Sequence, residues 1–464
     1  MTFATTNPAT GEVEKTFDAH TPDEIDAKLA RAKTGFEAMR KMGFDERARL
    51  MRSAADLLDA EAPDLARVLT TEMGKTFASA KAEAAKCALS LRWFADNSER
   101  LLADQPIDDH SFVRFEPLGP VLAIMPWNFP LWQVLRFAGP GLMAGNVGVL
   151  KHAANVPQTA LYIEELFRRA GYPDGAFTTL LVSSSDVAAV IEDERIAAVT
   201  LTGSERAGAA VAAAAGRVLK KCVLELGGSD PFVVTGTADL ERSASVAVTA
   251  RVQNNGQSCI AAKRFIVDAE VYDEWVERFV QKMAALTVGD PMDPSTDVGP
   301  LVTEAQREEI AGQVDDAREK GATVACGGSS VAGPGWYYEP TVLCDVTTGM
   351  RVLTEEVFGP VATVERYADL DEAIRIANRT QYGLGSSIWT HDAKERDLLV
   401  AGIQAGAVFV NTMVASSPEM PFGGIKRSGY GRELSEMGMK EFCNAKSVRS
   451  DPNASIPSPG GAAE

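Results

Sequence analysis

Histidine and cysteine are scarce in this chain of 464 residues. It has four histidines and six scattered cysteines, with no CxxC pair and no histidine at metal-ligand spacing. This pattern argues against a disulfide framework and against a zinc site, so no metal is expected. Because a catalytic pair of histidine with serine or cysteine has few residues to draw on, carboxylates become the natural candidates for a catalytic base.

Positive charge and long apolar runs are also lacking. Lys and Arg number 46 against 64 Asp and Glu, a formal net charge of −18, which repels nucleic-acid phosphates and anionic lipid surfaces. No apolar run approaches the roughly 20 residues that span a bilayer, and residues 1–11 lack the regions of a signal peptide. We therefore expect a cytoplasmic protein with no nucleic acid and no membrane as partner.

Three common catalytic motifs are missing as well. The chain contains no GxxxxGK[ST] phosphate loop, no GxSxG nucleophile elbow and no HExxH zinc motif. Their absence argues against the nucleotide hydrolases, serine hydrolases and zinc peptidases that depend on them.

The patterns that are present predict an α/β protein. Residues 21–24 form a capping box with proline at the first helical position, and helix is expected from there to about Leu102. Short apolar runs separated by amphipathic stretches follow, which is typical of buried parallel strands. The runs are Val121–Met125, Val147–Leu150, Thr179–Val182, Ala197–Leu201, Val223–Leu226, Pro231–Thr235, Arg264–Val267, Val361–Val364, Ser387–Trp389 and Ala407–Val410. They predict two doubly wound, Rossmann-like domains that meet near Gly227 and Gly228.

Two segments carry residues suited to covalent chemistry. Cys259 follows the polar turn 254–258, which can expose its thiol for attack. Glu225 ends an apolar run, and the strand ends of open α/β sheets are where ligands bind and where partial burial tunes a base. Taken singly, each residue keeps an ordinary alternative: a buried structural cysteine and a solvated glutamate.

Two further segments suit oxyanion and phosphate binding. Asn128 lies between Pro126 and Pro130, a rigid setting for a hydrogen-bond donor to an oxyanion, although an aromatic turn that merely packs is the alternative. Residues 202–208 form a strand-to-helix turn whose helix N-terminus can hold a pyrophosphate. They lack the GxGxxG spacing, so a helix cap by Ser204 explains them equally well.

Seven motifs occur in order along the chain. They are Pro-Trp-Asn at 126–128, Lys151 after a strand, Gly-Ser at 203–204, Glu-Leu-Gly-Gly at 225–228, Gly-Gln-Ser-Cys at 256–259, Glu-Glu-Val-Phe-Gly-Pro at 355–360 and Pro-Phe-Gly-Gly at 421–424. Together they resemble the aldehyde dehydrogenase superfamily, and the resemblance covers nearly the whole chain.

The resemblance implies roles for the reactive residues. Cys259 would add to the aldehyde carbon to give a thiohemiacetal and later a thioester, while Asn128 and the Cys259 backbone N–H hold the oxyanion. Glu225 would activate the water that hydrolyses the thioester. Glu356 would hold the nicotinamide ribose, and Phe358 would pack beside it.

The resemblance also implies a nicotinamide dinucleotide. Its cofactor-contacting positions are Trp127, Asn128, Lys151, His152, Ala153, Ala154, Gly203, Ser204, Leu226, Glu356 and Phe358. Members selective for NAD often carry a glutamate at the position of Ala154, so here a 2′-phosphate would meet Lys151 and no opposing charge. We therefore expect NADP as the preferred cofactor, with NAD as an alternative.

Residues 151–153 and 220–231 are most similar to succinate-semialdehyde dehydrogenases. This similarity implies NADP-dependent oxidation of succinate semialdehyde to succinate. Arg136 would bind the distal carboxylate at the pocket mouth and Ser417 would add a hydrogen bond, although a surface salt bridge is the alternative for Arg136.

Other activities stay open. Gln253 replaces a second arginine of some members, so glutarate semialdehyde or broad aliphatic aldehydes are alternative substrates. A cysteine thioesterase or acyltransferase that needs no dinucleotide is the rival from another class, but it leaves Lys151 and Glu356 without a purpose.

The resemblance implies the following domains. Residues 1–106 and 118–227 would form the cofactor-binding domain, 228–421 the catalytic domain, and 107–117 with 422–450 an oligomerisation element. Strands of that element would pair with a neighbouring subunit, so a homodimer or homotetramer is expected. Residues 451–464 are poor in large apolar side chains and are expected to be disordered.

Overall fold

Long helices fill the N-terminal part of the chain. The computed structural model describes residues 3–451. A hairpin of β1 (Phe3–Thr6) and β2 (Val13–Phe17) precedes α1 (Pro22–Met39), α2 (Phe44–Met73) and α3 (Phe77–Leu101). The predicted capping box is confirmed, because the Thr21 side chain accepts from the Glu24 N–H while the Glu24 carboxylate accepts from the Thr21 N–H.

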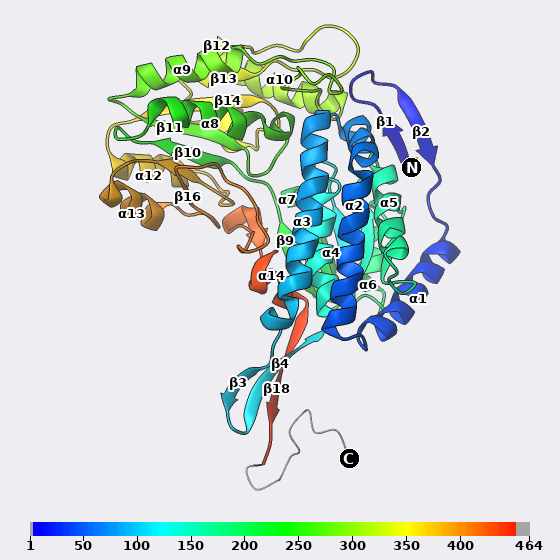
Figure 1. The fold of residues 1–464 in the computed structure, drawn as a ribbon. Coiled ribbons are helices and arrows are strands. Elements are labelled where there is room, and N and C mark those ends of the chain that lie inside the picture. Colours follow the sequence, from blue (N-terminus) through cyan, green and yellow to red (C-terminus); the bar gives the residue numbers. More distant parts are fainter. Residues whose placement is uncertain (1–2, 452–464) are drawn as a thin grey trace.

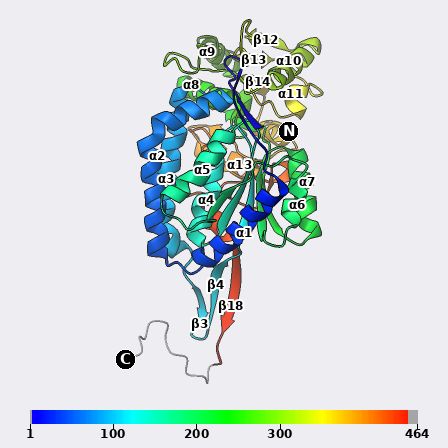
Figure 2. The ribbon, with the colours of Figure 1, turned by 90° about the vertical axis from the view of Figure 1, so that its right-hand side faces the viewer.

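The first sheet has six strands in the order β17-β9-β8-β5-β6-β7, all parallel except β17. The strands are β5 (Pro120–Met125), β6 (Val147–His152), β7 (Phe177–Thr179), β8 (Ala198–Thr202), β9 (Lys221–Glu225) and β17 (Gly429–Tyr430). Helices α4 (Trp132–Ala144) and α5 (Pro157–Arg169) cover one face, backed by α2 and α3, and α6 (Val187–Glu192) and α7 (Glu205–Arg217) lie on the other face (Figure 2). The strand order reverses between β5 and β8, which places a ligand crevice at the carboxyl ends of these strands.

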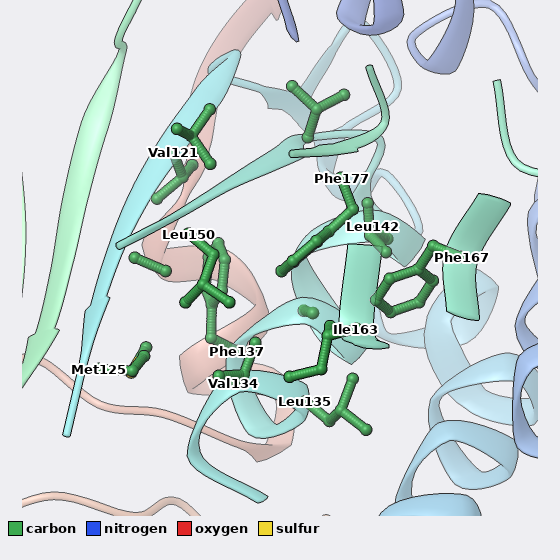
Figure 3. Packing of buried hydrophobic residues seen from close by; sticks show 14 of the residues in the cluster. Val121, Met125, Val134, Leu135, Phe137, Leu142, Leu150, Ile163, Phe167 and Phe177 are labelled. Carbon is green, nitrogen blue, oxygen red and sulfur yellow. The ribbon is translucent and has the colours of Figure 1, made fainter. Parts of the chain in front are cut away.

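The core of this domain lies between the sheet and α4 and α5. Figure 3 shows Leu150 and Phe177 of the strands facing Phe137, Ile163 and Phe167 of the two helices. The rings of Phe167 and Phe177 lie 5.1 Å apart. All residues of α4 are buried, because the sheet covers one side of the helix and α3 the other.

The second sheet has seven strands in the order β12-β13-β14-β11-β10-β15-β16. The strands are β10 (Asp230–Val234), β11 (Ala262–Asp268), β12 (Thr323–Cys326), β13 (Thr341–Cys344), β14 (Val361–Tyr367), β15 (Ser387–Trp389) and β16 (Phe409–Val410). The helices are α8 (Leu240–Val252) and α9 (Tyr272–Ala284) on one face, α12 (Leu370–Asn378) and α13 (Ala393–Gly402) on the other, and α10 (Glu304–Glu319) and α11 (Arg351–Thr354) near β13 (Figure 1). The prediction of two doubly wound domains is confirmed.

A third sheet projects from the body of the molecule (Figure 1). It consists of β3 (Gln105–Asp108), β4 (Ser111–Pro117) and β18 (Cys443–Arg449), in the order β18-β4-β3. The boundary predicted at residue 422 is wrong. After the short turn η2 (Lys426–Ser428), β17 joins the first sheet and α14 (Ser435–Glu441) packs on α4, so the projecting part begins only at Cys443.

Two predictions concern membranes and the C-terminal tail. Among residues 3–451, no helix is both long and apolar enough to cross a bilayer. The tail predicted to be disordered lies outside the described residues after Asp451.

Candidate active site

Cys259, the predicted nucleophile, follows a tight turn. In η1 (Gln253–Gly256), Asn254, Asn255 and Gly256 have φ of 56°, 57° and 75°, the left-handed region. A Cβ on Gly256 would lie 2.4 Å from the carbonyl carbon of Gly359, so only glycine fits between the two loops. This turn directs the half-buried Cys259 into a cavity of about 250 Å³.

Lys263 holds the backbone of the Cys259 loop in place. Its buried ammonium donates to the carbonyl oxygens of Ser258, Cys259 and Ala261 at 3.1, 2.8 and 3.2 Å. Sequence reasoning missed this residue, because a lysine inside a strand carries no motif. The three hydrogen bonds fix the backbone that presents the sulfur.

The Cys259 thiol is protonated at neutral pH in this setting. Burial raises its pKa to about 12, although Arg136 and Lys263 oppose that effect. Since the thiolate is the attacking form, the site needs a group that accepts the proton.

Asn128, the predicted oxyanion donor, lines the Cys259 cavity. Its buried Nδ2 donates to the carbonyl oxygen of Gln257 at 3.0 Å, which leaves the second amide hydrogen for another acceptor. The Asn254 amide donates to the Asn128 carbonyl oxygen at 2.8 Å and locks the segment in place. Asn128 and Cys259 line the same cavity, so an oxygen on a carbon bound to the sulfur has a preorganised donor.

Glu225 ends β9 as a buried carboxyl. Both of its oxygens lack a hydrogen-bond partner among the described residues. Burial raises the pKa of Glu225 well above its usual range and neighbouring Glu433 adds to this, against the opposite effect of Arg136. The environment therefore favours proton uptake by Glu225, as a catalytic base requires.

Arg136 is not at a pocket mouth, so the predicted position is wrong. It is 2% exposed, forms an ion pair with the carboxylate of Glu433, and donates to Thr202 Oγ1 at 3.3 Å. Its guanidinium also lies 4.4 Å from the ring centroid of Phe422. The alternative of a surface salt bridge is wrong too, because the pair with Glu433 is internal. The guanidinium therefore already has a counter-ion in Glu433.

Glu356 lies against the link between the two domains. The Gly228 N–H donates to its Oε1 at 3.0 Å, and Lys263 Nζ lies 3.8 Å from the same oxygen. A Cβ on Gly228 would lie 2.7 Å from the Cys259 carbonyl oxygen, so this glycine allows the nucleophile loop to approach. The rings of Phe358 and Trp127 meet edge to face at 5.7 Å. Glu356, Phe358 and Trp127 line the Cys259 cavity, and their contacts with a cofactor stay predictions.

A second cavity of about 370 Å³ lies between α6 and α7. Ser204 lines both cavities and also caps α7, accepting from the Ala207 N–H at 3.3 Å. Gly203 and Leu226 line the Cys259 cavity. Lys151, at the end of β6, lines the second cavity and makes no ion pair within residues 3–451, while burial lowers its pKa. A helix N-terminus with an uncompensated ammonium nearby forms a site for phosphate groups.

The His152 side chain is held by hydrogen bonds to the backbone. Its Nε2 donates to the Pro130 carbonyl oxygen at 2.8 Å and its Nδ1 accepts from the Ala153 N–H at 2.9 Å. The ring is buried, which lowers its pKa to about 4, and both ring nitrogens bond to backbone groups. The contact of position 152 with a cofactor stays a prediction. Ala153 packs with Trp127 in a small apolar cluster, and the Ala154 carbonyl oxygen accepts from the Ala4 N–H.

Ser417 lies in the segment before the Pro-Phe-Gly-Gly motif. It is half-buried and lines a narrow cavity with Ser416, Phe422 and Ile260, the neighbour of Cys259. The structure therefore places Ser417 on a wall near the nucleophile.

Five polar residues that line the two cavities are not among the predicted site residues. They are Gln133, Thr202 and Gln306 around Cys259, and Ser184 and Arg206 in the second cavity. Arg206 and Thr202 lie in the turn 202–208 that the sequence singles out, whereas the others come from unremarkable helix and loop positions.

Cys259 and Asn128 line one cavity beside the N-terminus of α7, whereas Glu225 lies buried at the end of β9 and is not among the residues that line this cavity. The chain matches the model of the aldehyde dehydrogenase family over residues 1–448 and belongs to that family. It is 59% identical to a protein of Mycobacterium ulcerans named succinate-semialdehyde dehydrogenase (NADP(+)) 1, over 97% of this chain and 99% of that one. The protein of the same name from Mycobacterium tuberculosis strain H37Rv is also 59% identical, with the same coverage. The crystal structure of succinic semialdehyde dehydrogenase from Streptococcus pyogenes in complex with NADP+ is similar, with TM-score 0.94 and 37% identity over 97% of this chain and 99% of that one.

Proposed function

We propose that this chain oxidises succinate semialdehyde to succinate with NADP+ as the oxidant. One observation carries the proposal: Cys259, Asn128 and Glu356 line a single cavity that adjoins the N-terminus of α7. The names of the relatives from Mycobacterium and Streptococcus supply the substrate and the cofactor.

The residues that line the Cys259 cavity and the second cavity fit a dinucleotide. Gly203 leaves the α7 N-terminus open, because a Cβ there would meet only Leu201, at 3.7 Å. The apolar wall of the second cavity suits a planar base, and Lys151 suits a 2′-phosphate that no carboxylate at position 154 repels. When bound, the cofactor supplies a hydride acceptor.

The chain's own residues supply the remaining chemistry. The Cys259 thiol gives up its proton to water, its sulfur bonds to the aldehyde carbon, and the electron pair of the carbonyl double bond moves to the oxygen, which takes up the charge opposite the Asn128 amide. Loss of hydride from that carbon leaves a thioester. Glu225 then takes a proton from water as the water oxygen bonds to the thioester carbon, and departure of the Cys259 sulfur releases the acid.

The test is formation of reduced cofactor from succinate semialdehyde, followed at 340 nm with NADP+ and with NAD+ in parallel. We expect turnover with both and a higher kcat/KM with NADP+. No turnover with either cofactor would reject the proposal, and faster turnover of glutarate semialdehyde or butanal would reassign the substrate.

We also propose that the chain works as a homodimer or homotetramer through its projecting sheet. Every residue of β3 is exposed, and among the described residues β18 pairs on one side only. An open strand edge of this kind is a template for pairing with another chain.

A further inference from the structure

Glu83 of α3 caps the helix that follows Asn128. The side chain is buried, and its Oε1 accepts from the backbone N–H groups of Leu131 and Trp132 at 3.0 and 2.8 Å. Helix α4 begins at Trp132 without a capping side chain of its own, and Pro130 has no N–H to donate. The carboxylate of a different helix therefore satisfies the N–H groups at the start of α4.

Lys75, in the link between α2 and α3, supplies the counter-ion of Glu83. Its ammonium is fully buried and pairs with Oε2 of Glu83, the oxygen that α4 leaves free. It also lies 4.3 Å from the ring centroid of Phe129, the residue after Asn128. Burial lowers the pKa of Lys75, and Glu83 opposes that effect. The pair therefore holds the Asn128 segment at one ring and at two backbone groups.

The link between α2 and α3 also contacts the turn before the nucleophile. The Asn255 amide of that turn donates to the Gly74 carbonyl oxygen at 2.8 Å. The link and the start of α3 therefore contact both the turn that presents Cys259 and the segment that presents Asn128. Contacts on both sides fix the position of the amide relative to the sulfur.

The position of Asn128 matters because an oxyanion donor acts only at short range. A misplacement of about 1 Å can lower the rate about 100-fold. Asn128 and Gln133, which flank the N–H groups that Glu83 caps, both line the Cys259 cavity. A shift at the start of α4 would therefore move this wall of the cavity.

We propose that Glu83 and Lys75 are positioning residues, which act on the reaction by holding the oxyanion donor Asn128 in place. Neither residue lines the Cys259 cavity or the second cavity. The inference rests on the proposed function and concerns its chemical step. Loss of the pair should lower kcat and leave the KM values for aldehyde and NADP+ nearly unchanged.

The test compares two variants that both lack the buried charges, Lys75→Met/Glu83→Gln and Lys75→Met/Glu83→Leu. The first keeps an oxygen that can accept from the N–H groups of α4, whereas the second has a side chain of similar volume without an acceptor. We expect the second to lower kcat about 10- to 100-fold with KM values within about threefold of the wild type, and the first to retain most of kcat. Equal kcat values in the two variants would overturn the proposal.

Two further variants guard against effects on folding. Glu83→Asp keeps the charge opposite Lys75 but withdraws the acceptor by one methylene, so it should also lower kcat, by about tenfold. Unchanged kcat in Glu83→Asp would overturn the proposal even if the leucine variant does not fold. The matched control is Glu72→Leu, which removes a buried carboxylate that accepts from the first N–H groups of α5 and should leave kcat nearly unchanged at saturating cofactor.

A combination with Asn128→Ala shows whether the pair acts through this amide. In that background, adding Lys75→Met/Glu83→Leu should lower kcat less than about twofold further, because the donor that the pair positions is already gone. A merely structural role would lower kcat by the same factor with and without Asn128, and that result would overturn the proposal.

Hydrogen–deuterium exchange separates this proposal from the proposed function. Deuterium uptake by a peptide that contains Leu131 and Trp132 should be faster in Lys75→Met/Glu83→Leu than in Lys75→Met/Glu83→Gln, whichever aldehyde the enzyme oxidises. Equal uptake in the two variants would overturn the positioning role. Failure of the wild type to oxidise succinate semialdehyde would instead reject the proposed function, and the kinetic comparison would then use the aldehyde that the wild type does oxidise.

Discussion

Burial acts in the same direction on the two reactive groups of the site. It raises the pKa of the Cys259 thiol to about 12 and that of the Glu225 carboxyl well above its usual range. Because the thiolate fraction of such a thiol grows about tenfold per pH unit, alkylation of Cys259 by iodoacetamide should accelerate steadily from pH 7 to 10. Mass spectrometry of the modified peptide gives the rates, and a plateau below pH 9 would contradict the expectation.

In the proposed mechanism, Glu225 acts only in the second half of the reaction. In Glu225→Gln, acylation of Cys259 should still release one reduced cofactor per subunit, while steady turnover falls by about 10²- to 10⁴-fold because no base activates water. Stopped-flow absorbance distinguishes the two phases. The exposed Glu419→Gln should turn over normally, and undiminished steady turnover in Glu225→Gln would remove this residue as the base.

Ala154 bears on the choice of cofactor. Placing a carboxylate near Lys151 should repel a 2′-phosphate and bind a free ribose hydroxyl, so Ala154→Glu should raise the KM for NADP+ about tenfold or more and lower that for NAD+. Ala154→Gln has the same shape without the charge and should leave the KM for NADP+ nearly unchanged. Equal effects of both variants would mean that size decides, not charge.

Sequence motifs identified the residues whose surroundings are formed by their own neighbours along the chain. Cys259, Asn128 and Glu356 line one cavity because each follows a turn or strand end that its own neighbours define. Arg136 was misplaced because its partner, Glu433, comes from the far end of the chain. The residues next to Arg136 in the sequence do not indicate its ion pair with Glu433.

At the scale of elements, the turn before the nucleophile depends on one glycine. Gly256→Ala would set a methyl group against Gly359 and strain a φ of 75°. We expect a loss of about 1–3 kcal/mol in the free energy of unfolding and a fall of about 100-fold in kcat, because the sulfur shifts. Urea denaturation and steady-state kinetics measure both. Gly216→Ala in α7, where a Cβ meets nothing within 4 Å, should keep kcat and gain about 0.4–1 kcal/mol.

The sequence patterns missed β12 and β17 at sheet edges and also β13, a buried interior strand between β12 and β14. In β12 exposed residues alternate with half-buried ones, and β17 has only two residues, so neither forms a continuous apolar run. The strand expected at Thr179–Val182 is Phe177–Thr179, and the apolar residues after it are buried without being paired in the sheet. Apolar runs indicate which residues are buried. Where the buried residues are not the ones that pair in the sheet, the predicted strand is shifted along the chain.

At the scale of the whole molecule, assembly into an oligomer can be tested at the projecting sheet. Ile107 of β3 is 69% exposed, and a charge there should oppose docking of a second subunit. We expect Ile107→Asp to lower the mass measured by light scattering at micromolar concentration. Leu219→Asp, at a 94% exposed position outside this sheet, should leave the mass unchanged. An unchanged mass for Ile107→Asp would place the interface elsewhere.

The return of β17 to β9 has a consequence for synthesis on the ribosome. The first sheet is built from residues 120–225, yet its outer edge at β9 stays open until residues 429–430 emerge, after the entire second sheet. Nascent chains interrupted before that point would therefore carry an uncovered strand bearing Glu225, a target for chaperones and for misassociation. The last strand to join the first domain therefore also covers the strand end that carries Glu225, and this domain is finished only when the chain is nearly complete.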